Sequence, residues 1–184
     1  SGVTVDFYIN DDTAWLRKAV RWVVNIVVAI ACGWFLVYGF GEQVLISGNS
    51  MQPQLSAQDV VLMNRIIYVT GTPDRFDVVI FEREDGKKNV KRIIGLPGET
   101  VQIRDSRVYI DGEPLKEDKM GEVSLAGRAA DPVRLGEKEY FLLGDNRGSS
   151  EDSRFPNIGN VKREQILGKA WFRMLPLLNL GFVS

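Results

Sequence analysis

The apolar residues of this chain follow two different patterns. Between Trp22 and Phe40, 19 consecutive residues include only one strongly polar side chain, that of Asn25. Because an α-helix rises by about 1.5 Å per residue, a run of this length crosses a hydrocarbon layer about 30 Å thick. A helix in a soluble core would show one polar face, whereas this run is apolar on all sides. The pattern therefore predicts one N-terminal transmembrane helix over residues 22–40.

A cleaved secretory signal peptide is the main alternative for this segment. Ala29, Ile30 and Ala31 form a small-x-small cleavage pattern just before Cys32. The apolar part of a cleaved signal peptide covers only about 7–15 residues and then gives way to polar sequence. Here the apolar run continues through residues 33–40, so we favour an uncleaved anchor.

Basic residues predict the orientation of this helix. Arg17, Lys18 and Arg21 precede the apolar run, and the next basic residue after it is Arg65. Lys and Arg are enriched on the cytosolic side of a membrane span. We therefore expect residues 1–21 to be a cytosolic tail and residues 42–184 to be an extracytoplasmic domain, which is long enough to bury its own core.

The remainder of the chain contains short apolar runs that are rich in Val, Ile, Phe and Tyr and are separated by glycine-containing or acidic turns. Such runs are typical of β-strands, and no stretch after residue 40 keeps a sustained helical apolar period. The fold class is therefore predicted to be mostly β. The predicted strands cover residues 43–47, 60–68, 76–82, 89–94, 100–103, 107–110, 140–143 and 166–172.

Turn residues refine this prediction. Asp111-Gly112 is the sequence signal of a two-residue type I′ hairpin that follows the strand at residues 107–110. Residues 116–138 are polar and contain several Gly residues and a Pro. We expect a small, loop-rich β insertion at about residues 105–138.

Composition excludes several kinds of chemistry. The chain has no histidine, one cysteine, and a net charge of -1. It therefore cannot build a Ser-His-Asp or Cys-His catalytic group, an intrachain disulfide or a thiolate metal cluster. The balanced charge also argues against a nucleic-acid surface. If the protein is an enzyme, its acid-base group is a carboxylate, a lysine, a tyrosine or a backbone amine.

Three segments carry candidate chemistry. Ser47-Gly-Asn-Ser50-Met-Gln-Pro-Gln-Leu55 places a serine in a turn after a strand, although such a turn is usually ordinary loop structure. In Lys91-Arg-Ile-Ile-Gly-Leu-Pro-Gly-Glu99, alternation places Lys91 on the same side as Ile93. Desolvation among aliphatic side chains would lower the pKa of such a lysine, whereas a surface lysine is the commoner case. Residues 144–154 form a polar loop after an apolar strand.

Taken in order, these segments resemble the type I signal peptidases of bacteria, which are membrane-anchored Ser-Lys endopeptidases. The shared motifs are Ser50-Met-x-Pro, the Lys91 motif, the Gly-Asp-Asn-Arg-x-x-Ser-x-Asp-Ser-Arg loop at 144–154, and a strand at 75–81. The single predicted span and short insertion resemble the compact Gram-positive form. The resemblance implies an antiparallel β-sheet catalytic domain and removal of signal peptides from exported preproteins after small-x-small sites.

The resemblance also implies the roles of individual residues. Ser50 matches the nucleophile, Lys91 the general base, and Ser150 the hydroxyl that orients the lysine. The Ser50 backbone N–H matches one donor of the oxyanion hole. Some members place a second donor, a serine, where this chain has Gly48, and losing a donor costs about 2.7–4 kcal/mol, so another group or a water is expected to replace it. The residues that match a structuring role in the polar loop are Asp145, Asn146, Arg147, Asp152 and Arg154.

The substrate is expected to bind as an extended strand beside two segments of the chain. Ile46 and Val90 match positions that line shallow pockets for small side chains. The other residues that match the substrate-binding segments are Ser47, Gly48, Asn49 and Asn89. The resemblance implies exported preproteins and the lipid bilayer as partners, and a single-pass location in the cell membrane. It implies no cofactor, no metal and no nucleic acid.

Two other classes of protein share parts of this pattern. Self-cleaving repressor proteins resemble the same Ser-Lys fold, but they require a DNA-binding unit and have no membrane span. Non-catalytic relatives that act as membrane-anchored assembly chaperones lack the serine or the lysine. Both Ser50 and Lys91 are present here, so the peptidase is the favoured interpretation.

Overall fold

The computed structural model describes residues 14–183 and divides the chain into two units, Ser1–Gly39 and Phe40–Ser184. The described part of the first unit belongs to one helix, α1 (Ala14–Phe40). The predicted helix at residues 22–40 is therefore present, and it begins eight residues earlier, within the predicted cytosolic tail. The rest of that tail lies outside the described residues. Within residues 14–183, none of the helices combines the length and the apolarity that crossing a membrane requires, so the transmembrane part of the prediction is not confirmed.

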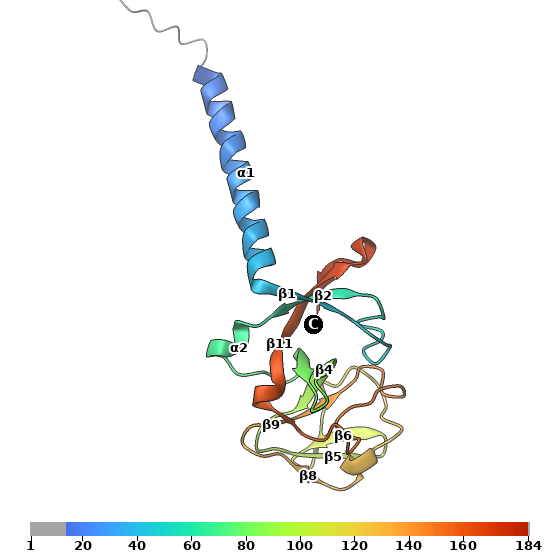
Figure 1. The fold of residues 1–184 in the computed structure, drawn as a ribbon. Coiled ribbons are helices and arrows are strands. Elements are labelled where there is room, and N and C mark those ends of the chain that lie inside the picture. Colours follow the sequence, from blue (N-terminus) through green and yellow to red (C-terminus); the bar gives the residue numbers. More distant parts are fainter. Residues whose placement is uncertain (1–13, 184) are drawn as a thin grey trace, which may run out of the picture. The chain divides into compact units, whose positions relative to one another are not determined.

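The second unit contains a large antiparallel sheet, which confirms the mostly β prediction (Figure 1). Its strand order is β1-β2-β11-β3-β4-β9-β10, and β12 pairs with β11 beside this path. The strands are β1 (Gly41–Leu45), β2 (Val60–Asn64), β3 (Val78–Glu82), β4 (Lys88–Gly95), β9 (Glu139–Leu143), β10 (Val161–Lys162), β11 (Ile166–Leu175) and β12 (Gly181–Phe182).

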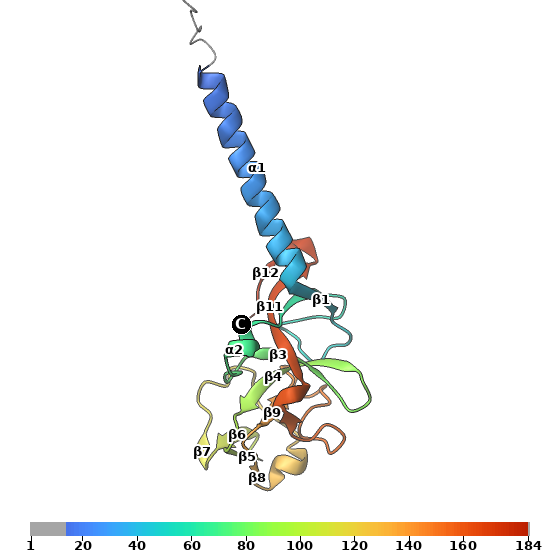
Figure 2. The ribbon, with the colours of Figure 1, turned by 60° about the vertical axis from the view of Figure 1, so that its left-hand side comes forward.

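A second, four-stranded sheet has the order β7-β6-β5-β8 and lies at the end of this unit away from β1 and β12 (Figures 1 and 2). Its strands are β5 (Thr100–Arg104), β6 (Arg107–Ile110), β7 (Glu113–Pro114) and β8 (Val133–Arg134). The predicted insertion at about residues 105–138 contains most of this sheet. The sheet begins earlier, at Thr100, because β5 pairs with β6 and β8 and makes no pair with β4.

The two hairpin turns of this sheet have left-handed backbone. Asp111 and Gly112 have φ angles of 49° and 86°, and they connect the pair Ile110↔Glu113. Positive φ at both central residues defines a type I′ turn, so the predicted hairpin is confirmed. Asp105 and Ser106, with φ angles of 50° and 58°, connect β5 to β6 in the same way. The sequence analysis missed this second turn because it contains no glycine.

Each of the eight predicted strands overlaps an observed strand, although the boundaries differ in most cases. The prediction of strand through residue 68 is wrong, because β2 ends at Asn64 and helix α2 (Ile67–Thr70) follows. The Asn64 side chain accepts hydrogen bonds from the backbone N–H groups of Ile66 and Ile67 at 3.0 and 3.1 Å, and such local bonds favour a turn over a continuing strand. The remaining short helical turns are η2 (Gly127–Ala130), η3 (Arg163–Gln165) and η4 (Leu177–Asn179).

Strand β3 explains why the large sheet is stable around the candidate site. Val78 and Ile80 belong to one core cluster, and Val79 and Phe81 belong to another. Because successive side chains of a strand point to opposite faces, both faces of the sheet are buried at β3. A core of this kind fixes the position of the neighbouring strand β4, which carries Lys91.

Candidate active site

Ser50 and Lys91 are 41 residues apart in the sequence and are joined by a hydrogen bond in the structure. The distance from Lys91 Nζ to Ser50 Oγ is 2.8 Å. Ser50 lies in the turn that follows β1, and Lys91 lies in the middle of β4. Lys91 Nζ also donates a hydrogen bond to the Val90 carbonyl at 3.2 Å, and this second bond helps to fix the position of the amine. A hydroxyl and an amine at this distance can exchange a proton.

Burial changes the chemistry of the Lys91 amine. The residue is only 4% exposed. Desolvation lowers the pKa of Lys91 from 10.5 to about 8, and the neighbouring carboxylates of Asp152 and Glu151 partly oppose this shift. A lysine with a lowered pKa is partly neutral near physiological pH, and only the neutral amine accepts a proton.

The turn at Ser50 leaves one backbone donor free. Gly48 has a φ angle of 91°, a conformation that glycine adopts without strain. The Ser50 carbonyl accepts a hydrogen bond from the Asn146 N–H at 3.0 Å. Among the described residues, no group accepts a hydrogen bond from the Ser50 N–H. This N–H is thus available to stabilise an oxyanion that forms beside Ser50 Oγ.

Gly144 allows the polar loop at residues 144–154 to approach this turn. A Cβ atom at Gly144 would collide with Ser150 Oγ and with the Ser50 carbonyl oxygen. Only a residue without a side chain permits that approach. The sequence analysis included Gly144 in a motif but gave it no role, because close backbone approach is not visible in one sequence.

Buried ion pairs hold the same loop. Asp152 and Arg154 are 2.7 Å apart, with side chains that are 0% and 1% exposed. Asp152 also accepts a hydrogen bond from the Gly144 N–H at 3.0 Å. Two of the residues that match a structuring role thus form a buried ion pair, and the bond from Gly144 to Asp152 joins the two ends of the loop.

Three further loop residues bond to partners that the sequence analysis did not identify. Asp145 accepts two hydrogen bonds of 2.7 Å from Arg92, which follows Lys91 on β4. Arg147 donates two hydrogen bonds of 2.8 Å to Asp118, in the insertion. Asn146 Nδ2 donates to the Asn49 carbonyl at 3.2 Å. The loop is thereby fixed to β4, to the insertion and to the turn at Ser50.

Ser150 differs from its expected arrangement. Its hydroxyl is buried and has no hydrogen-bond partner among the described residues. The lysine-orienting hydrogen bond that the resemblance implied is therefore absent from this structure, in which the Lys91 amine bonds to Ser50 and Val90. A buried hydroxyl without a partner is uncommon. The Ser150 hydroxyl lies close to the Ser50 turn, because only Gly144, which has no side chain, stands between them.

A cleft of about 290 Å³ opens beside the Ser50–Lys91 pair. We call it the β1–β4 cleft, and it is lined by residues 42–47, 50, 51 and 88–91. Of the predicted substrate-binding residues, Ile46, Ser47, Asn89 and Val90 line it. Gly48 and Asn49 do not. The sequence analysis missed six lining residues, namely Glu42, Gln43, Val44, Leu45, Met51 and Lys88.

Two free strand edges face this cleft. β1 is the terminal strand of its sheet, and β4 pairs with β9 only from Arg92 onward. The Ile46 N–H donates to the Asp59 carbonyl, and the Ile46 carbonyl accepts from the Gln58 N–H. In extended chain, the backbone N–H and C=O groups of successive residues point to opposite sides, so those of Ser47 point away from residues 58 and 59. Ser47 makes no hydrogen bond to another described residue. The cleft therefore offers backbone groups to an extended peptide.

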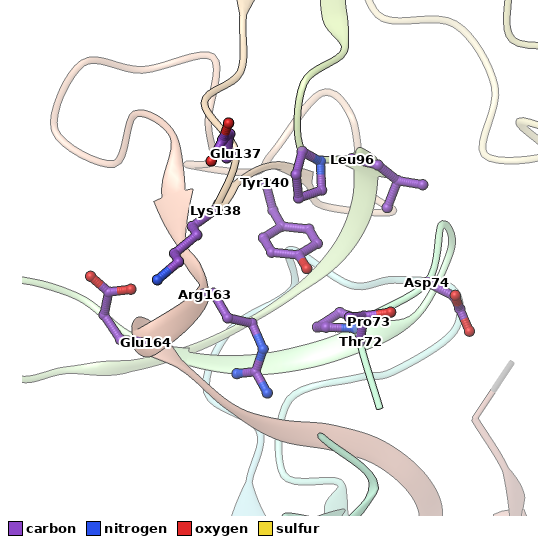
Figure 3. A pocket seen from close by; sticks show the side chains of 10 residues that line it. Thr72, Pro73, Asp74, Leu96, Glu137, Lys138, Tyr140, Arg163 and Glu164 are labelled. Carbon is purple, nitrogen blue, oxygen red and sulfur yellow. The ribbon is translucent and has the colours of Figure 1, made fainter. Parts of the chain in front are cut away.

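A larger cavity of about 700 Å³ lies elsewhere on the domain (Figure 3). Its lining includes Asp74, Lys138, Tyr140 and Arg163, and it contains neither Ser50 nor Lys91. Size alone would favour this cavity, but the nucleophile, the low-pKa amine and the free strand edges all belong to the smaller cleft. Within residues 14–183, no group of three or more His, Cys, Asp and Glu side chains is placed to hold a metal ion.

The Ser50 hydroxyl is hydrogen-bonded to the buried Lys91 amine, and both lie beside free strand edges. This arrangement is that of a serine hydrolase that acts on extended peptides. The family model described as "Signal peptidase, peptidase S26" matches residues 19–175. A "Probable signal peptidase I-2" of Synechocystis is 31% identical over 180 residues, covering 94% of this chain and 79% of that protein. "Signal peptidase I T" of Bacillus subtilis is 35% identical over 167 residues, covering 85% of each.

A crystal structure of a signal peptidase I from Enterococcus faecalis is 34% identical and aligns with a TM-score of 0.46, over 54% of this chain and 97% of that chain. The extent of the family match and the identity of the curated relatives show that the chain belongs to the signal peptidase family, peptidase S26. It is accordingly a serine endopeptidase that removes signal peptides from exported preproteins.

Proposed function

We propose that Ser50 and Lys91 are the nucleophile and the general base of this signal peptidase. The observation that carries the proposal is the 2.8 Å hydrogen bond between Ser50 Oγ and Lys91 Nζ, made by an amine whose pKa burial lowers to about 8. An unassisted serine hydroxyl is a weak nucleophile and needs an adjacent base. The absence of histidine from the sequence leaves this lysine as the base in contact with the serine.

The reaction proceeds by acyl transfer in two stages. Neutral Lys91 removes the proton of Ser50 Oγ as the oxygen attacks the carbonyl carbon before the cut. The resulting ammonium gives its proton to the leaving amine, the C–N bond breaks, and the mature protein departs. Lys91 then takes a proton from water, whose oxygen attacks the ester and releases the signal peptide. Collapse of this second intermediate returns the proton to Ser50, so both residues regain their starting state.

The Ser50 N–H serves as one oxyanion donor in both stages, because no described residue accepts a hydrogen bond from it. Ser150 is proposed to orient Lys91 once the lysine is charged. Its hydroxyl is buried beside the Ser50 turn and bonds to no other described residue, and an ammonium is a strong donor to such an oxygen. Asp145, Asn146, Arg147, Asp152 and Arg154 act through the loop that they hold.

The substrate is proposed to lie as a strand in the β1–β4 cleft. Backbone groups of Ser47 and of residues 88–91 form its hydrogen bonds, and Ile46 and Val90 limit the side chains that enter. Ile46 is only 5% exposed and Val90 packs against the same core cluster. A wall fixed in this way excludes side chains much larger than alanine, which accounts for cleavage after small-x-small sites.

The membrane arrangement is also part of the proposal. Residues 22–40 are proposed to anchor the chain, with residues 1–21 in the cytosol and the peptidase domain at 42–184, including an insertion at about 105–138, outside. The 19-residue apolar run and the basic residues before it support this arrangement. Leu177, Leu178 and Phe182 are 71%, 98% and 74% exposed, and lipid contact would remove these apolar side chains from water.

Cleavage of a preprotein by the detergent-solubilised protein tests this function. We expect a single cut directly after a small-x-small site, no cut by the Ser50→Ala variant, and no requirement for an added metal or cofactor. Cleavage at several unrelated sites, or undiminished cleavage by that variant, would contradict the proposal.

A further inference from the structure

An ion pair spans the β1–β4 cleft at the end away from Ser50. Lys88 Nζ lies 2.6 Å from the Glu42 carboxylate, and both residues line the cleft. Glu42 belongs to β1 and Lys88 to β4. These strands are separated by three others in the sheet, so the pair does not belong to a strand ladder. It joins the two free edges between which the substrate is proposed to bind.

The pair lies on the signal-peptide side of the cut, because Ile46 and Val90, which are proposed to contact the residues before the cut, stand between it and the Ser50–Lys91 pair. The four antiparallel pairings from β1 through β2, β11 and β3 to β4 give β1 and β4 the same direction. Both strands therefore run from the ion pair toward Ser50 and Lys91. Lys88 precedes Lys91 by three residues, which at about 3.3 Å per residue is about 10 Å along the cleft. In an extended substrate, about the fourth to sixth residues before the cut therefore lie beside Glu42 and Lys88.

The two members of the pair differ in their other partners. The second oxygen of Glu42 is 3.1 Å from Arg65, and its hydrogen bond from Lys88 lowers the pKa of Glu42, so it is a carboxylate at neutral pH. Lys88 has no other ion pair among the described residues. Glu82 stands opposite Lys88 in the β3–β4 ladder and makes no salt bridge with it. When a substrate strand parts the pair, Glu42 keeps Arg65, whereas Lys88 loses its partner.

We propose that Glu42 and Lys88 form a charge-selective subsite for the region of the signal peptide about four to six residues before the cut. Lys88 binds an acidic side chain of the substrate in place of Glu42, and it repels a basic one. This inference rests on the proposed function, because it uses the substrate strand in the β1–β4 cleft. It adds a specificity that is independent of the small-x-small requirement, since the pair lies beyond Ile46 and Val90.

The test compares three peptides that share one alanine-x-alanine site and carry Asp, Asn or Lys at the fourth to sixth positions before the cut. The full chain in detergent is assayed at low salt, and kcat/KM for the Asp peptide is divided by that for the Lys peptide. Because both members of the pair are partly exposed, we expect a ratio of about two to five for the wild type, falling as salt is added.

Two variants separate the subsite from a merely structural pair. Lys88→Glu should invert the ratio to below one, and Glu42→Gln should raise it, because Lys88 is then free. Each ratio is measured within one protein, so a partly folded preparation does not change it. The matched control is Lys138→Glu, which makes the same charge change in the separate cavity of Figure 3 and should leave the ratio at its wild-type value.

The outcomes distinguish the subsite from the proposed function. If the wild type cleaves all three peptides at equal rates and Lys88→Glu does the same, the subsite is wrong and the Ser50–Lys91 assignment stands. A ratio that Lys138→Glu shifts as much as Lys88→Glu would also overturn it, because the effect would then reflect net charge. Failure to cleave even the Asn peptide would refute the proposed function itself.

Discussion

Arg92 and Asp145 form a buried, two-pronged ion pair immediately beside the proposed general base. Both N···O distances are 2.7 Å, and the side chains are 3% and 0% exposed. Arg92 follows Lys91 on β4, and Asp145 is the second residue of the polar loop at 144–154, so the pair joins the strand of the base to the loop that lies against Ser50. The position of Lys91 therefore depends on a contact that takes no part in the chemistry.

Removing one partner of this pair should destabilise the domain strongly. Asp145→Ala leaves the Arg92 guanidinium buried without its anion, which costs about 3–5 kcal/mol in the free energy of unfolding. The control is Arg83→Ala, which breaks the partly exposed pairs of Arg83 with Glu151 and Asp85 and should cost about 0–1 kcal/mol. Urea unfolding of the three proteins measures both values. Equal losses in the two variants would show that burial does not set the strength of the Arg92 pair.

The rate should follow the ionisation of Lys91. Because burial lowers its pKa to about 8 and only the neutral amine accepts a proton, kcat/KM should be low in mild acid and rise through about pH 8. A pH profile of kcat/KM with a stable peptide measures this. A profile governed by a group near the reference carboxylate pKa of about 4 would instead identify an Asp or Glu as the base.

The same ionisation predicts a pH-dependent effect on stability. Since the pKa of Lys91 is 10.5 when unperturbed and about 8 in the folded protein, the folded protein binds fewer protons than the unfolded chain between these values. Below about pH 8 the folded state carries a buried charge, and this penalty disappears as the pH rises toward 10.5.

Replacing the lysine with an uncharged side chain of similar length should therefore stabilise the domain at neutral pH. We expect Lys91→Met to raise the free energy of unfolding by on the order of 2–3 kcal/mol at pH 7. The gain should shrink as pH rises through the window between the two pKa values. Thermal unfolding of both proteins across this range measures it, and a gain that stays constant with pH would mean that packing, not charge, is responsible.

The pocket walls predict a change in specificity. Truncating Ile46 or Val90 to Ala should deepen the cleft and admit a valine at the first or third position before the cut. We expect the kcat/KM of a valine peptide, relative to the matching alanine peptide, to rise by about tenfold. The ratio is compared between wild type and each variant, so a loss of stability does not affect it. An unchanged ratio in both variants would remove these residues from the pocket.

The sequence predicted the site better than it predicted what supports the site. Alternation and residue type located β3, β4 and the Asp111-Gly112 turn, because these depend on local patterns. The Ser50–Lys91 pair was predicted from the family motifs, because the lack of histidine alone left a carboxylate, a lysine, a tyrosine or a backbone amine as possible bases.

The supporting ion pairs could not be predicted in the same way. Arg92 pairs with Asp145 over 53 residues and Arg147 with Asp118 over 29. Any of the chain's 24 acidic residues was a possible partner for these arginines, and no local pattern selects one. The same holds for Glu42 and Lys88, which meet only because the sheet brings β1 opposite β4.

The most direct test of the central claim is preprotein cleavage by paired variants of the proposed nucleophile and base. Ser50→Ala and Lys91→Ala are compared with Ser149→Ala and Lys87→Ala, which change the same residue types at exposed positions. Product is measured by mass, and folding of each protein is checked by thermal unfolding. We predict that both site variants are folded and inactive, because the two residues act as a unit, while both controls cleave at the wild-type rate. Substantial turnover by folded Ser50→Ala or Lys91→Ala would contradict the account.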